Sequence, residues 1–164
     1  MGQWNDVAHF MYGRGFWYAD PLREFHGLTE DQLYWTPDRN CMCLLWHAGH
    51  IAERECRYMG QFNLDSAAYR IPKPYNVFAE WSDVKSVRGA GPWTDVFNWV
   101  RDVREESHRF IDVIKERWHE VPPDSREGLS VASWVFITAA HTAEHIGRIK
   151  HMKAMLMNRP EEVC

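Results

Sequence analysis

The strongest constraint on the fold of this chain is a proline-free stretch near its carboxyl end, residues 137–150, which carries two histidines four positions apart. Apolar residues recur through this region at helical spacing, and Ser130 and Ser133 supply polar side chains where a helix could start. One long helix is therefore expected from about residue 130 to residue 157. His141 and His145 then lie on one face of it, one turn apart.

The neighbours of these two histidines on that helix face are largely apolar: Trp134, Ile137, Thr138, Arg148, Met152 and Met155. Such a face should point into the core and take both histidines with it. Buried imidazoles need polar partners, because an unsatisfied buried polar group costs about 1–3 kcal/mol. A divalent metal ion would satisfy both at once, although a pair at this spacing, taken alone, favours two ordinary helix histidines over a metal site.

Composition limits the remaining possibilities. A chain of 164 residues is long enough for one domain spanning residues 1–164, and 45% apolar with 26% charged residues is typical of a soluble globular protein. The net charge of -4 provides no basic surface for nucleic acid, and no apolar run approaches the length of a membrane span. Four cysteines without a CxxC pair, and a start without a secretion signal, favour a cytoplasmic location.

A second helix with histidines is expected from about residue 42 to residue 62. Its apolar stripe consists of Leu44, Leu45, Ala48, Ile51, Ala52, Tyr58, Met59 and Phe62, and Glu53 lies off the stripe. On a helical wheel His47 borders this stripe, whereas His50 sits further round, nearer Arg54 and Arg57. The wheel alone therefore slightly favours His47 as the inward histidine.

The rest of the chain also predicts helices. Residues 94–119 form a clearly amphipathic third helix with Thr94 as a plausible N-cap, and residues 1–25 read as a helical segment interrupted by Gly13, Gly15 and Pro21. Gly27 followed by Thr29 reads as a helix stop and a capped turn. No strand pair is evident, so the expected fold class is all-α, most simply a four-helix bundle.

Residues 63–92 form the longest irregular segment, with three prolines and two glycines. A connection of this length in a small domain is usually functional or mobile. We expect it to lie over the open end of the bundle near the histidines and to move more than the helices. A simple surface excursion is the alternative.

Two motifs resemble those of the DinB-like (DinB/YfiT) superfamily. The family's second helix has a small starting residue, an apolar pair, a histidine seven positions after the start and a glutamate five positions later; Cys43, His50 and Glu55 occupy these places. Residues 141–147 are similar to the fourth-helix motif, and residues 28–33 match the turn after helix one. The chain departs from the pattern at Cys43, where serine is usual, and in its aromatic, glycine-broken N-terminal region.

The resemblance implies a four-helix bundle in which His50, His141 and His145 bind zinc, nickel or iron. It thus favours His50 over His47. Three imidazoles leave a coordination position open, as a catalytic site requires. A metal ion in such a site lowers the pKa of a bound water or thiol, which produces a nucleophile at neutral pH.

Four further residues near the motifs have alternative interpretations. Glu55 could support a ligand imidazole through a hydrogen bond, and Glu144 is expected to be solvated. Arg148 could meet an anionic substrate, although pairing with a carboxylate is favoured. Cys43 could be a thiolate ligand or a redox partner, but a small apolar residue at a helix start is the preferred interpretation.

By this resemblance the chain is expected to be a metal-dependent enzyme, either a transferase that activates a low-molecular-weight thiol or a hydrolase, acting on a small-molecule substrate. The alternative is a non-catalytic, stress-related metal-binding interaction protein. A homodimer is expected in both cases, because helices three and four carry much bulky apolar surface. The residues concerned are Trp99, Phe110, Trp118, Trp134 and Phe136. The alternative is that they fill a wide core.

Overall fold

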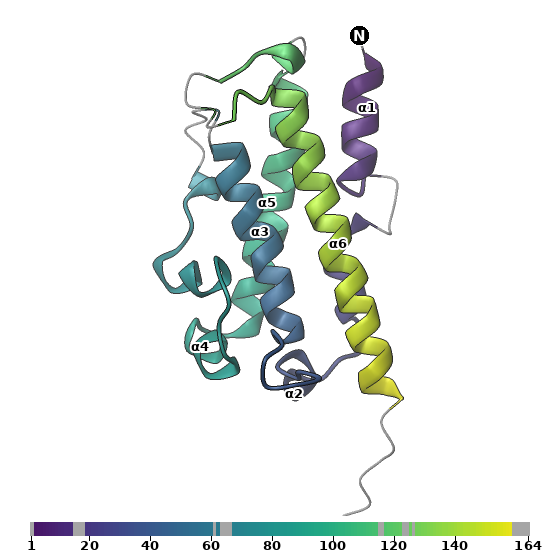
Figure 1. Cartoon of the computed structure of the whole chain (residues 1–164), viewed down its shortest axis with the longest axis vertical. Coiled ribbons are helices and arrows are strands. Elements are labelled where there is room, and N and C mark those ends of the chain that lie inside the picture. Colours follow the sequence, from purple (N-terminus) through teal and green to yellow (C-terminus); the bar gives the residue numbers. More distant parts are fainter. Residues whose placement is uncertain are drawn as a thin grey trace, which may run out of the picture.

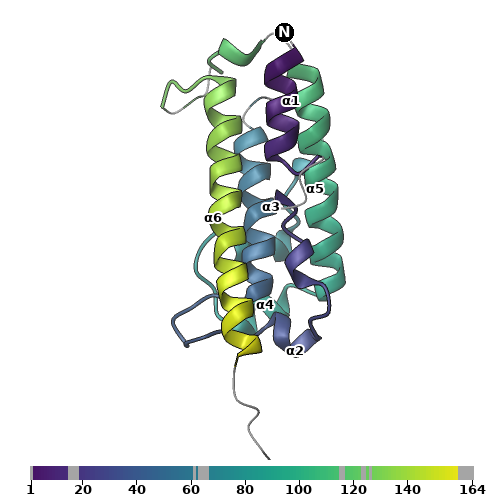
Figure 2. The same ribbon diagram turned by 90° about the vertical axis from the view of Figure 1, so that its right-hand side faces the viewer.

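The computed structural model describes residues 2–14, 19–60, 62, 67–114, 117–122, 125 and 127–158, and within them it is helical without any strand. Four long helices form the bundle: α1 (Gly2–Met11), α3 (Leu44–Gly60), α5 (Trp93–Ile114) and α6 (Val131–Met157). α3 packs against α5 and α6, and α1 contacts the same two helices on the other side of the bundle (Figures 1 and 2). The all-α four-helix expectation is confirmed. None of the described helices is both long and apolar enough to cross a bilayer.

Short helices connect these four. They are η2 (Arg23–Phe25), α2 (Glu30–Leu33), η3 (Ala67–Tyr69), η4 (Lys73–Phe78), α4 (Val84–Gly89) and η5 (Arg117–His119). The predicted turn after the N-terminal region is present, since Gly27 adopts a φ of 80°. Thr29 then caps α2 in a capping box with Gln32, which satisfies two backbone donors at the start of that helix.

The predicted bounds of the helices hold to different degrees. Ser130 caps α6 by accepting from the backbone of Ser133, as expected. α5 begins at Trp93, so Thr94 is inside the helix and is not its N-cap. Residues 117–119 form a separate 3-10 turn that buries Trp118. The N-terminal helix is short and ends at Met11, shortly before Gly13, which adopts a φ of 95°. Gly15 lies outside the described residues.

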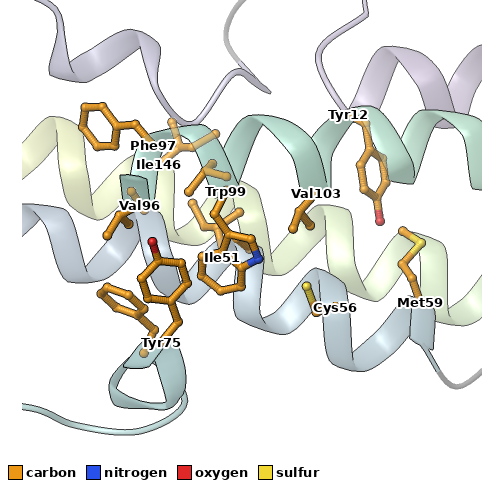
Figure 3. Close-up of a cluster of buried hydrophobic side chains, with 14 of the residues drawn as sticks. Tyr12, Ile51, Cys56, Met59, Tyr75, Val96, Phe97, Trp99, Val103 and Ile146 are labelled. Atoms are coloured by element: carbon orange, nitrogen blue, oxygen red, sulfur yellow. The ribbon is translucent and has the colours of Figure 1, made fainter. Parts of the chain in front are cut away.

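α3 is buried on nearly every side, which its sequence pattern did not predict. Its outer face is covered by the connection between α3 and α5 (Figure 1). Tyr75, Phe78 and Val87 of this connection are buried, and Figure 3 labels Tyr75 among the buried side chains. Within its described residues this connection is built from short helices, while residues 63–66 lie outside the description. As a result Glu53, which was expected on the outward face, has no exposed surface and pairs with Arg57.

The bulky aromatic residues of the third and fourth helices mostly lie inside the single chain. Those that are buried are Trp99, Phe110, Trp118 and Trp134, and Phe136 is half-buried. Figure 3 shows Trp99 of this group among the buried side chains around α3 and α5. These residues therefore do not supply the surplus surface that motivated a homodimer, and assembly stays a prediction.

A buried ion pair crosses the core between α3 and α5. Arg104 Nη2 lies 2.6 Å from Glu55 Oε1, and the hydroxyl of Ser107 donates to Glu55 Oε2 over 2.9 Å. Burial raises the pKa of Glu55, and the Arg104 guanidinium opposes that effect. The interpretation of Glu55 as a support for a ligand imidazole is wrong, because these partners on α5 occupy its carboxylate.

Replacing Arg104 with methionine should lower the free energy of unfolding by about 3–5 kcal/mol, because Glu55 would keep its burial but lose its cationic partner. Urea unfolding followed by circular dichroism measures this change. The exposed pair of Arg148 and Glu144 is the matched control, and Arg148→Met should cost no more than about 1 kcal/mol. Equal losses in the two variants would contradict the assignment of a buried, stabilising pair.

Candidate metal centre

Three histidines meet where α3 packs against α6. His50 comes from α3, and His141 and His145 come from consecutive turns of α6. One ring nitrogen from each can be chosen so that all three lie within 4.8 Å of one another. The ring centroids are 4.5–5.0 Å apart, and His50 and His145 are buried while His141 is half-buried. The structure therefore brings together the three residues that the motifs selected.

The helix face that carries His141 and His145 is only partly in the core. Trp134, Thr138 and Met152 on this face are buried, whereas Ile137 and Met155 are 40% and 42% exposed. The face thus runs along the edge of the bundle instead of through its centre. This placement leaves the histidines at a boundary, buried on one side and within reach of solvent at His141.

The hydrogen bond of His50 fixes its tautomer. Nδ1 lies 2.6 Å from the backbone carbonyl oxygen of Phe78, and a carbonyl can only accept, so Nδ1 carries the hydrogen. Nε2 consequently holds the lone pair, as a metal ligand requires. The indole of Trp46 stacks on the imidazole at 4.3 Å between centroids, which further restrains the ring.

His47 is a neighbour of the group rather than one of its three members. Its Nδ1 lies 2.9 Å from Nδ1 of His145, so one of these two nitrogens donates and the other accepts. His47 is as buried as His50, with 5% and 6% of their surfaces exposed. The wheel was correct that His47 points inward, but it gave no indication that His50 is covered as well.

His141 has a buried ring nitrogen that lacks a partner. Nδ1 of this residue is inaccessible and makes no hydrogen bond to any described residue. Such an atom carries a desolvation cost of about 1–3 kcal/mol unless something else satisfies it. A metal ion held by the three imidazoles would do so, and the chemistry of the donor set fits an ion of the transition series.

The electrostatic surroundings keep these imidazoles neutral. Burial is the largest cause, and it lowers the pKa of His50 and His141 to about 4 and that of His145 to about 2. The positive charge of Arg148 acts in the same direction on all three. Because metal ions bind the neutral form of imidazole, the group is ready for a cation at neutral pH without first losing protons.

For Cys43 and Arg148 the structure supports the less reactive of the two interpretations, a packed apolar residue and a partner of a carboxylate. Cys43 is buried, and burial raises the pKa of its thiol to about 11, so it stays protonated and packs as a small apolar residue. Arg148 and Glu144 are exposed and pair with each other along α6. Cys43 therefore does not supply a thiolate to the histidine group.

Sequence reasoning missed Gly49 and Phe78. A Cβ on Gly49 would lie 2.5 Å from Cδ1 of Phe78, so the close approach of the connection to α3 requires glycine at this position. The signal in the sequence was a glycine inside a helix next to a candidate ligand, which often marks close contact with another part of the chain.

The fold and the site together define a helical bundle with a three-histidine group suited to metal binding. A family model of the DinB superfamily matches residues 19–149, a range that contains all three histidines, and the chain belongs to this superfamily. The resemblance inferred from the motifs is thereby confirmed. No curated protein and no solved structure matches the chain.

The lowered pKa values of these histidines predict a pH dependence of stability in metal-free protein. As pH falls below about 6.5 the unfolded chain takes up protons on histidines that stay neutral in the folded chain until about pH 4. The thermal midpoint should therefore fall steadily from pH 7 to pH 5, measured with a chelator present.

His145→Phe should make this pH dependence less steep, because it removes one of the histidines whose side chain stays neutral in the folded chain across this pH range. His151→Gln, at an exposed position of the same helix, is the control and should keep the wild-type slope. If His145→Phe and wild type show the same slope, the pKa of His145 is not lowered in the folded chain and the prediction is wrong.

Proposed function

We propose that the chain binds one divalent transition-metal ion through His50, His141 and His145, and that it is a metal-dependent enzyme. The observation that carries this proposal is the convergence of three neutral imidazoles, one of them with a buried nitrogen that has no other partner. Imidazole ligands suit zinc, nickel and iron alike, so the donor set supports this group of metals without selecting among them.

The reaction class we propose is transfer to or from a low-molecular-weight thiol. Three protein ligands leave room for a further ligand, and a metal ion there supplies Lewis acidity that favours the ionised form of a bound thiol or water. Cys43 cannot supply the sulfur, since its thiol is buried and protonated. A thiol nucleophile would therefore come from solution as a small molecule.

The residues of the chain have separate tasks in this proposal. The carbonyl of Phe78 and the imidazole of His47 hold two of the ligands in orientation through their Nδ1 atoms. The half-buried position of His141 leaves an approach from solvent for substrate. Arg148 lies one turn beyond His145 and offers a positive charge beside this approach, although Glu144 partly neutralises it.

The alternative function is a non-catalytic, metal-binding interaction protein that forms a homodimer. Exposed apolar side chains on two adjacent helices favour a contact surface of this kind. They are Trp4, Val7 and Phe10 on α1 and Ile137 on α6, each at least 40% exposed. This surface, rather than the buried aromatic residues, is the part of the chain that a dimer would cover.

Protein purified without added metal should contain close to one zinc, nickel or iron ion per chain, as measured by inductively coupled plasma mass spectrometry. His50→Ala, His141→Ala and His145→Ala should each abolish this binding, because two imidazoles hold a divalent ion far more weakly than three. His47→Ala should retain the metal. If His47→Ala strips the metal and His50→Ala keeps it, the ligand assignment is wrong.

Turnover distinguishes the two candidate functions. Consumption of a small thiol in the presence of an electrophile, measured with metal-loaded protein and again after chelation, should depend on the metal. Metal-loaded wild-type protein without activity toward any thiol and electrophile pair would favour the interaction protein. Light scattering at two concentrations tests the homodimer separately, because a monomer keeps a mass near 19.4 kDa.

A further inference from the structure

Three side chains of α3 bind one short run of backbone in the connection that follows it. Trp46 Nε1 donates to the carbonyls of Val77 and Glu80, both at 3.1 Å, and Arg54 Nη2 donates to the carbonyl of Ala79 at 2.7 Å. Between these two lies the hydrogen bond from His50 to the carbonyl of Phe78. The carbonyl groups of residues 77–80 are called the carbonyl row below.

The spacing of the three donors explains why they act together. Residues 46, 50 and 54 are each four apart, so their side chains lie along one face of α3. The carbonyl row follows that face, and every one of its four oxygens accepts a hydrogen bond from it. The connection is therefore attached to α3 by the same face that presents the candidate ligand His50.

The position of the carbonyl row is set by packing beneath it. Phe78 is fully buried and lies against Gly49, and its ring stacks on Trp99 of α5 at 6.2 Å between centroids. A side chain at position 49 would push the Phe78 ring away from α3, because a Cβ there would come within 2.5 Å of it. Gly49 thus determines how closely the carbonyl row approaches His50.

We propose that the carbonyl row is a positioning element of the metal centre, and that its docking on α3 and metal binding by His50 reinforce each other. This inference rests on the proposed metal site. His50 is the shared group: its Nδ1 donates to the row, which leaves Nε2 for the ion and holds the ring in place. A free imidazole would divide its population between two tautomers and several orientations.

The coupling has a direct physical basis. A metal ion withdraws electron density from the imidazole it binds, so the Nδ1 hydrogen becomes a stronger donor to the Phe78 carbonyl. By linkage, a docked row must raise metal affinity by the same factor by which bound metal favours docking. Loss of partners of this kind typically weakens metal binding by about 10–100-fold.

Gly49→Ala tests the inference without altering a ligand or a donor. Zinc affinity, measured by competition with a chromophoric chelator, should fall by about 10–100-fold. Gly147→Ala is the matched control, since Gly147 is also a helical glycine close to a candidate ligand but a Cβ there would have nothing within 4 Å. This control should bind zinc as tightly as wild type.

Trp46→Phe provides a second variant should Gly49→Ala fail to fold. It keeps an aromatic ring over His50 but removes the N–H that holds both ends of the carbonyl row, so zinc affinity should again fall. A purely structural role would lower the thermal midpoint and leave the affinity of the folded protein unchanged. Wild-type zinc affinity in every folded variant of Gly49 and Trp46 would overturn the inference while leaving the metal site intact.

Amide hydrogen exchange adds a readout on the row itself. Zinc should slow exchange in residues 73–82 of the wild-type protein and should have no such effect in His141→Ala. Unchanged exchange in this segment of zinc-loaded wild type would also overturn the inference. Wild-type protein that binds no zinc would overturn the proposed metal site and the inference with it.

Discussion

Burial of α3 on nearly all sides is the constraint on which the rest of the structure depends. A helix in the centre of a bundle is usually apolar all round, yet α3 carries four buried histidine and glutamate residues, His47, His50, Glu53 and Glu55. Each needs a partner because desolvation without one is costly. The partners come from α5, α6, the connection after α3 and α3 itself, and α3 therefore organises polar contacts throughout the bundle.

The ligands and their support arise from the same constraint. If the outer face of α3 were open to water, His50 could hydrate its Nδ1 and turn freely. Because Phe78 and its neighbours cover that face, the imidazole has one strong partner and one orientation. The candidate centre is thus formed by packing as much as by the choice of histidine.

Much of the fold could be predicted from the sequence because its signals are local. Periodicity placed the long helices, and the side chains of Ser130 and Thr29 marked two helix starts through their capping. The histidine pair of α6 needed no more than the spacing of four. The start of α5 was misjudged by one residue, which is within the uncertainty of any boundary drawn from pattern alone.

The remaining features depend on contacts between distant segments. A helical wheel treats polar residues as outward, so it placed Glu53 on the surface and ranked His47 above His50. It contains no information about residues 73–80, which cover that side of α3. Only the family motif identified His50 as a candidate ligand. Neither the wheel nor the motif identified its hydrogen-bond partner, because every residue type has a backbone carbonyl and the identity of Phe78 gives no sign of this contact.

α1 stands apart from this organisation. Polar contacts supplement the apolar packing of its buried Ala8: His9 contacts His108 and Asp112 at 2.9 and 2.7 Å, and the Tyr12 hydroxyl just beyond the helix donates to the carbonyl of Val135. It contributes no histidine to the three-histidine group, and the family match begins only at residue 19. Substitutions on the outward face of the N-terminal helix can therefore change the surface that this chain presents without replacing any of the three histidines.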